Sequence, residues 1–132
     1  MASRNLSDAD PTLAHKFITV RHEYEDRYPG RTALVTCTYR SPLEQAQIYA
    51  QGRTAPGPIV TQLDGVTHKS NHNVWPARAL DFAVVISGKI SWDAAQYEAV
   101  AHLAEAQGLV AGAHWTHFKD APHLELPGGN PA

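Results

Sequence analysis

The pattern of apolar and polar positions predicts three helices. The first extends from Pro11 to about Tyr28, where apolar side chains recur every three or four residues along one face. The second covers Leu43 to about Gln51 and follows a Ser-Pro pair, whose serine is suited to cap the helix N-terminus. The third covers Asp93 to Gln107, and Gly108 is suited to end it. Between these helices lie the segments that we expect to form a sheet.

Short runs rich in β-branched and apolar residues predict the strands. They lie at residues 33–38, 80–86, 114–118 and 123–126, with a short return strand at 90–92. The predicted fold is therefore α+β: a single domain of residues 1–132, with a small antiparallel sheet of about four strands and about three helices. We expect the functional site on the open face of that sheet. Residues 53–69 form a long loop, and such loops in compact domains are usually functional.

Composition narrows the class of protein. The chain has 132 residues, a net charge of -2 and 43% hydrophobic residues, values typical of one soluble globular domain. This charge provides no strong attraction to nucleic acid or to an anionic membrane, and no apolar run approaches the roughly 20 residues of a membrane span. The polar N-terminus lacks the apolar segment of a secretory signal. We therefore expect a soluble monomer, made in the cytoplasm, with no nucleic-acid partner and no stable membrane association.

The candidates for chemistry are the histidines rather than the cysteine. The single cysteine, Cys37, lies inside the apolar run of residues 33–38 and fits a small buried core residue better than a nucleophile. Eight histidines are dispersed along the chain, and five of them fall in two clusters, at residues 68–72 and 114–123. This distribution favours a functional site over chance.

Each histidine cluster has an aspartate close to it. His72 and Asp81 stand at the two ends of a short loop, while Asp120 and His123 belong to the second cluster. Catalytic zinc typically takes three protein ligands from His, Asp or Glu and leaves a fourth position for water. A nearby carboxylate that does not bind the metal handles the proton of that water. We therefore predict that one zinc ion is bound by His72, Asp81 and His123, and that Asp120 acts as acid and base.

Each of these residues also has a plain structural explanation. His72 fits a surface loop, Asp81 fits the cap of a strand, and His123 fits a half-buried strand position. Together they are harder to explain in this way, because charged groups beside a core usually have a partner or a metal. His123 and Glu125 alternate with leucines and share one face of a strand. Glu125 therefore either orients a ligand histidine or faces water.

Two longer motifs connect these residues. Residues 70–81 follow the pattern Ser-x-His-Asn-x-x-Pro-x-Arg-Ala-x-Asp, and residues 115–125 follow Trp-x-x-Phe-x-Asp-x-Pro-His-x-Glu. In this order they resemble the zinc peptidases that cut bacterial cell-wall peptides, which include VanY-type D-alanyl-D-alanine carboxypeptidases and phage L-alanyl-D-glutamate endopeptidases. The resemblance runs from about residue 36 to 126. The length of the loop between His72 and Asp81 is more similar to the phage endolysin branch.

The resemblance implies a role for each site residue. The implied zinc ligands are His72, Asp81 and His123. Asp120 would be the catalytic acid and base, and Arg40 would stabilise negative charge on the substrate carbonyl or carboxylate. Gln45 and Ser70 are candidate substrate contacts. Among the remaining histidines, His117 fits an outer shell around the metal, whereas the resemblance provides no role for His68 and His114.

The function implied is hydrolysis of a peptide bond in the peptidoglycan stem peptide, most simply the L-alanyl-D-glutamate bond, by a phage or prophage endolysin in host lysis. Without a signal peptide, such an enzyme would need a membrane pore or another exit to reach the wall. The nearest alternative is a carboxypeptidase that removes terminal D-alanine. An alternative from another class is a non-catalytic zinc module that binds wall peptides or a partner protein. Asp120 counts against that module, because pure binding needs no base beside the metal.

Overall fold

The structure is a computed structural model that describes residues 2–65, 69–117 and 119–129. Its described part has an α+β fold, with three α-helices and one antiparallel sheet of five strands. The paired strands follow the order β1 (Arg31–Cys37), β2 (Ala79–Ile86), β5 (His123–Glu125) and β4 (Val110–Ala111), and β3 (Lys89–Ser91) also pairs with β2. The predicted fold class is therefore confirmed, and the sheet has one strand more than expected.

β2 is the central strand of the sheet. β1 pairs with it along one edge, and the other edge is shared between two short strands: β5 pairs with Ala79–Asp81 and β3 with Val84–Ile86. The register places Asp81 opposite Cys37 on one side and opposite His123 on the other. Segments far apart in the sequence therefore meet in one row across three strands.

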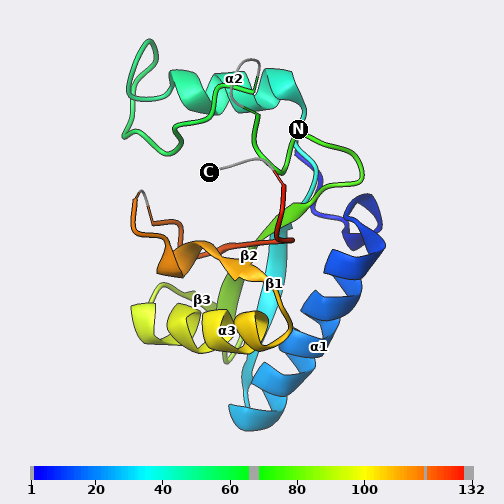
Figure 1. Cartoon of the computed structure of the whole chain (residues 1–132). Coiled ribbons are helices and arrows are strands. Elements are labelled where there is room, and N and C mark those ends of the chain that lie inside the picture. Colours follow the sequence, from blue (N-terminus) through cyan, green and yellow to red (C-terminus); the bar gives the residue numbers. More distant parts are fainter. Residues whose placement is uncertain (1, 66–68, 118, 130–132) are drawn as a thin grey trace.

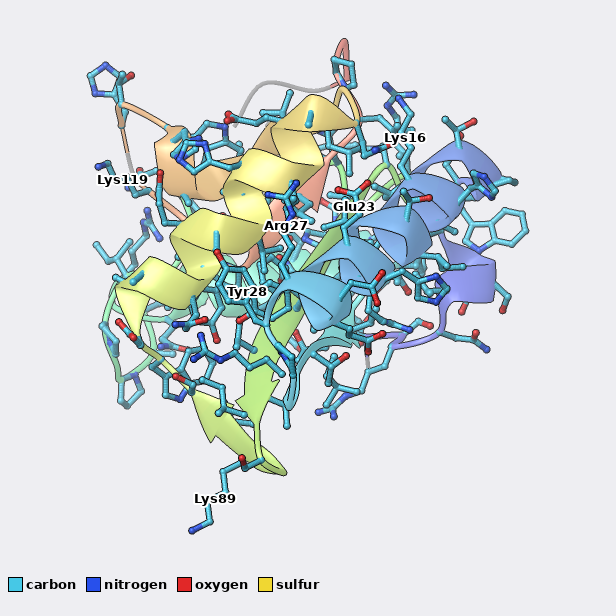
Figure 2. All side chains as sticks on the ribbon, turned by 90° about the horizontal axis from the view of Figure 1, so that it is seen from below. Lys16, Glu23, Arg27, Tyr28, Lys89 and Lys119 are labelled. Atoms are coloured by element: carbon cyan, nitrogen blue, oxygen red, sulfur yellow. The ribbon has the colours of Figure 1, made fainter. Side chains whose placement is uncertain are left out.

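α1 (Pro11–Arg27) and α3 (Ala94–Ala106) lie side by side against one face of the sheet (Figures 1 and 2). Their apolar side chains form the core with alternate residues of β2, and the ring of Tyr97 stacks on that of Phe82 with centroids 5.4 Å apart. Burial of a side chain such as Phe82 contributes roughly 1.5–3 kcal/mol. Because successive residues of a strand face opposite sides, Asp81 points away from this core. The helices thus cover one face and leave Asp81 on the other, as predicted.

α2 (Pro42–Ala50) stands apart from the other two helices (Figure 1). It begins with a capping box, in which the Ser41 hydroxyl accepts a hydrogen bond from the Glu44 amide at 3.1 Å and the Glu44 carboxylate accepts one from the Ser41 amide at 2.9 Å. The residue that α2 buries is Gln45, which is polar. A helix that buries a polar residue instead of an apolar stripe points to a role in a site.

All three predicted helices are confirmed, with ends within two residues of those expected. Two short 3₁₀ helices, η1 (Leu6–Asp8) and η2 (Gly112–His114), were not predicted. The strand expected at residues 114–118 is wrong for residues 114–117, because the Gly112 carbonyl accepts hydrogen bonds from the amides of both Trp115 and Asp120 and holds them in a 3₁₀ turn and a loop; residue 118 lies outside the described residues. In the described part of the chain, no helix has the length and apolar character to cross a membrane.

Candidate functional site

The site is centred on Asp81 in the middle of the sheet. Asp81 Oδ1 lies 3.3 Å from His72 Nε2 and 3.3 Å from His123 Nδ1. The two imidazole rings meet edge to face, with their centroids 5.1 Å apart. Asp120 Oδ2 lies 3.7 Å from His123 Nδ1. The structure therefore brings together all four residues that the sequence analysis assigned to the metal and its base.

His72 is held by a tightly hydrogen-bonded loop. The His72 amide donates to Ser70 Oγ at 3.1 Å, and the Ser70 amide donates to Asn73 Oδ1 at 2.8 Å. The His72 carbonyl accepts from the Arg40 amide at 2.8 Å, and Asn73 Nδ2 donates to the Arg40 carbonyl at 2.9 Å. These bonds join the loop to the end of β1, so the polar residues of the Ser-x-His-Asn motif fix the position of the histidine.

The second nitrogen of each imidazole has a partner that fixes the tautomer. His72 Nδ1 lies 2.7 Å from the Thr38 carbonyl, and His123 Nε2 lies 2.7 Å from Glu125 Oε1. Both partners are acceptors, so these nitrogens carry protons, and His72 Nε2 and His123 Nδ1 are directed at Asp81. Glu125 also accepts a hydrogen bond from Asn71 Nδ2 at 2.9 Å. Of the two alternatives for Glu125, the structure favours orientation of a histidine.

The separations of Asp81 from the two histidines match those between ligands of a small cation. Ligands about 2.0–2.1 Å from a tetrahedral zinc are about 3.3–3.4 Å from one another, and Asp81 Oδ1 lies 3.3 Å from each histidine nitrogen. Among the described residues, His72 Nε2 and Asp81 Oδ1 are buried atoms without a hydrogen-bond partner. Buried polar atoms are normally satisfied. The arrangement is therefore suited to a metal ion.

The charges of the site also favour a bound cation. Burial opposes protonation of His72, but the Asp81 carboxylate outweighs this effect and raises the pKa of His72 to about 10. Burial acts to raise the pKa of Asp81, but His72 and His123 hold it well below its usual range. The Asp81 carboxylate thus stays negative and stabilises a positive charge beside it. A proton on an imidazole or a metal ion provides that charge.

Asp120 is placed by the loop after η2. Its amide donates to the Gly112 carbonyl at 3.0 Å, and its carbonyl accepts from the His123 amide at 3.1 Å. A Cβ on Gly112 would lie 2.3 Å from the Asp120 carbonyl oxygen, so this close approach requires glycine. Burial, together with the Asp81 carboxylate, raises the pKa of Asp120. Asp120 is therefore a carboxyl that can hold a proton beside the two histidines.

Arg40, Gln45 and Ser70 also lie at the site. Arg40 Nη2 is 3.5 Å from Asp81 Oδ2, and Arg40 Nη1 donates to Gln45 Oε1 at 2.6 Å. Gln45 is fully buried, and its Nε2 donates to the Leu63 carbonyl at 2.9 Å. The side chain of Gln45 thus supports Arg40 and the loop after α2. Direct contact of Gln45 or Ser70 with a substrate remains a prediction.

A cavity of about 370 Å³ opens over these residues. One wall is charged and includes Arg40, Asp81 and Asp120. The opposite wall is largely apolar and is formed by α2 and the loop that follows it, with Ile48, Val60 and Leu63. Trp115 and His117 also line the cavity. This size and mixture of walls is typical of a pocket for a small polar ligand or a peptide segment.

The other residues singled out by the sequence lie in different surroundings. Cys37 is buried, as predicted, and its Sγ is 3.8 Å from His72 Nδ1 and within 4.8 Å of a carboxylate oxygen of Asp81. His114 contacts Glu98 and Glu105 on α3, and His68 lies outside the described residues. Sequence reasoning missed the Thr38 carbonyl and Asn71, because a backbone acceptor and a neutral amide provide no signal of a site.

The chain is similar in sequence to known peptidases. Residues 64–126 match the peptidase M15 family model described as D-alanyl-D-alanine carboxypeptidase. The peptidoglycan L-alanyl-D-glutamate endopeptidase CwlK of Bacillus subtilis (strain 168) is 35% identical to the chain over 108 residues, which cover 74% of this chain and 62% of that protein. The chain is therefore similar in sequence to the M15 peptidase family. It spans about 62% of the length of this curated relative.

A solved structure shares the fold of this chain. The structure of the Serratia marcescens L-Ala D-Glu endopeptidase ChiX matches with a TM-score of 0.69, over 96% of this chain and 88% of that chain. The two sequences are 22% identical over the match, so this likeness concerns the fold alone. M15 peptidases are zinc-dependent. Among the described residues, two candidate metal clusters at the site contain Asp81, one with Cys37 and His72 and the other with Asp120 and His123.

Proposed function

We propose that the protein is a zinc-dependent peptidoglycan peptidase that hydrolyses the L-alanyl-D-glutamate bond of the stem peptide. The observation that carries this proposal is the convergence of His72 and His123 on Asp81 at a cavity wall, with Asp120 beside them. The similarity to CwlK, which is named for this activity, supports the choice of bond. We also propose that residues 1–132 form one catalytic domain that works as a monomer.

The donor set fits one zinc ion held by His72, Asp81 and His123. Two imidazoles and a carboxylate are typical ligands of catalytic zinc, and His72 Nε2 and Asp81 Oδ1 are buried without another partner in the described part of the chain. The Thr38 carbonyl and the Glu125 carboxylate accept hydrogen bonds from the other ring nitrogens of His72 and His123, and such acceptors orient metal-binding histidines. When bound, zinc supplies a Lewis acid that polarises the scissile carbonyl and lowers the pKa of a water molecule.

Asp120 is the residue that moves the proton. Hydrolysis joins the oxygen of water to the carbonyl carbon and breaks the C–N bond, so one proton of the water must reach the leaving amine. Asp120 lines the cavity next to His123, and burial raises its pKa. A carboxyl in this environment accepts the proton as the water attacks and then delivers it to the amine.

Arg40 provides a fixed positive charge beside the reacting groups. Its guanidinium lies between Gln45 Oε1, at 2.6 Å, and Asp81 Oδ2, at 3.5 Å, and it lines the cavity. A guanidinium held in this way stabilises negative charge that develops on the carbonyl oxygen without having to reorganise. It also suits a carboxylate of the acidic stem peptide.

The proposal is tested by digestion of purified peptidoglycan, with and without a chelator, and identification of the fragments by mass spectrometry. We expect new glutamate amino termini that disappear with the chelator and return with added zinc. Release of free D-alanine would instead establish the carboxypeptidase that the description of the family model favours. No product from a zinc-loaded sample would favour a non-catalytic module that binds wall peptides.

We further propose that the enzyme acts as a phage or prophage endolysin. The support is the length of the loop between His72 and Asp81, which resembles that branch of the family. Co-expression in a bacterial host with a protein that forms membrane pores should lyse the culture, whereas either protein alone should not. The Asp120→Asn variant is the matched control. Lysis that does not depend on Asp120, or intact cells when both proteins are present, would contradict this role.

A further inference from the structure

A second cluster of metal-binding side chains lies on the surface, away from Asp81. Glu98 and His102 lie on α3, and His114 lies in η2. Glu98 Oε1 is 3.1 Å from His102 Nε2 and also contacts His114 Nε2, and the two imidazole rings have centroids 5.1 Å apart. One potential ligand atom from each residue lies within 4.8 Å of the others. A single carboxylate oxygen therefore stands between two imidazole nitrogens.

The geometry of this cluster follows from the helix and from the turn after β4. Glu98 and His102 are four residues apart, which places their side chains next to each other on one face of α3. The segment from β4 into η2 brings His114 onto the same face. Ligands about 2.0–2.1 Å from a tetrahedral metal are about 3.3–3.4 Å apart, so the 3.1 Å separation of Glu98 and His102 needs little adjustment.

The orientation of His114 is fixed by another carboxylate. His114 Nδ1 lies 2.8 Å from Glu105 Oε2, so this nitrogen carries the proton and Nε2 is directed toward Glu98. An imidazole whose outer nitrogen donates to a carboxylate is the usual arrangement of a metal-binding histidine. The same relation holds between His123 and Glu125 at the site described above.

We propose that Glu98, His102 and His114 bind a second transition-metal ion, of the class of zinc or nickel. Two imidazoles and one carboxylate suit these ions, and the exposure of the cluster leaves room for water as a further ligand. The ion connects α3 to η2, and the next residue, Trp115, packs on His123 with ring centroids 4.9 Å apart. A metal ion at this cluster links η2, the segment that leads into the Asp120 loop, to α3.

The alternative for this cluster is a set of ion pairs without a metal. In that case both nitrogens of His114 carry protons, one for Glu98 and one for Glu105, and Lys119 adds a positive charge close to Glu98. Lys119 projects from the loop after η2 (Figure 2). The two possibilities differ in the number of metal ions that the folded protein binds.

The test counts zinc ions by calorimetric titration of the full chain after removal of metal with a chelator. We expect two equivalents in the wild type and one in His102→Asn, a variant that should fold because the His102 side chain is 68% exposed. The matched control is His15→Asn, at an exposed position of α1, which should retain both equivalents. Glu105→Gln should keep the second ion but bind it about 10–100-fold more weakly.

Either of two results would overturn the proposal: a single equivalent in the wild type that His102→Asn retains, or a second equivalent that His102→Asn leaves unchanged. A single equivalent that His102→Asn abolishes would support this cluster and would contradict the site around Asp81. The count of ions does not depend on peptidase activity, so a failure here and a failure of the proposed function can be distinguished.

Discussion

The hydrogen bond between Glu125 and His123 provides a sharp test of how the metal site is held. Glu125 Oε1 lies 2.7 Å from His123 Nε2, and Glu125 Oε2 accepts from Asn71 Nδ2 at 2.9 Å. Both neighbours are donors, so the site needs a side chain that accepts twice. Glu125→Gln keeps the shape but replaces one acceptor with a donor. The NH₂ group of the glutamine then faces one of two donors. In one amide orientation it faces Asn71 Nδ2, and in the other it faces the proton on His123 Nε2.

Either orientation weakens the metal site. If the glutamine opposes His123, the imidazole proton moves to Nδ1 and removes the lone pair that faces Asp81. If it opposes Asn71, the loop that holds His72 loses a buried hydrogen bond. Loss of such a partner typically lowers metal affinity or activity about 10–100-fold, which corresponds to about 1.4–2.8 kcal/mol. We therefore expect a zinc affinity 10–100-fold below that of the wild type.

The assay is zinc affinity measured by competition with a chromophoric chelator, with circular dichroism to show that the variant is folded. Asp26→Asn, at an exposed position near the end of α1, is the control for the loss of one negative charge. It should bind zinc as the wild type does. A Glu125→Gln variant with zinc affinity within about threefold of the wild type, a range well below the usual effect of such a partner, would refute the reasoning.

Two further predictions concern Arg40 and Gly112. Arg40→Lys should retain zinc but lower kcat on peptidoglycan by about 10²–10³-fold. The reason is that a lysine ammonium cannot reach both Gln45 and Asp81. Steady-state assays measure kcat, and an unchanged value would exclude a role of Arg40 in charge stabilisation. Gly112→Ala should destabilise the fold by about 1–3 kcal/mol, because its Cβ would clash with the Asp120 carbonyl. Urea unfolding measures this change, and a free energy of unfolding equal to that of the wild type would contradict the clash.

The helices were predictable because their signals are local. Pro11 follows an aspartate that accepts from the Thr12 amide at 2.8 Å, and Ser41 with Glu44 forms a capping box. Such caps involve residues two or three positions apart, which a sequence displays directly. The strand expected around His114 failed for the converse reason. The hydrogen bonds that the Trp115 and Asp120 amides donate to the Gly112 carbonyl are backbone interactions, and no residue type in the segment indicates them.

The four central residues of the site were predictable from their types and motifs, but their arrangement was not. The meeting of Cys37, Asp81 and His123 depends on the register of β1, β2 and β5, including an irregularity in the register between Val35 and Cys37. Partners of the histidines, such as the Thr38 carbonyl, are backbone atoms that every residue has. The cluster around Glu98 was missed because His114 reaches it from outside α3, and only the fold brings the two segments together.

The most direct test of the account is the Asp120→Asn variant, examined for both zinc content and peptidase activity. Asp120 is proposed to move the proton and not to hold the metal, so the variant should retain the tightly bound zinc of the site around Asp81. Its kcat on peptidoglycan should fall by about 10²–10⁴-fold, the usual contribution of a general acid and base. A variant that keeps its zinc and its full activity would contradict the proposed mechanism, and a variant that loses the zinc would place Asp120 among the ligands.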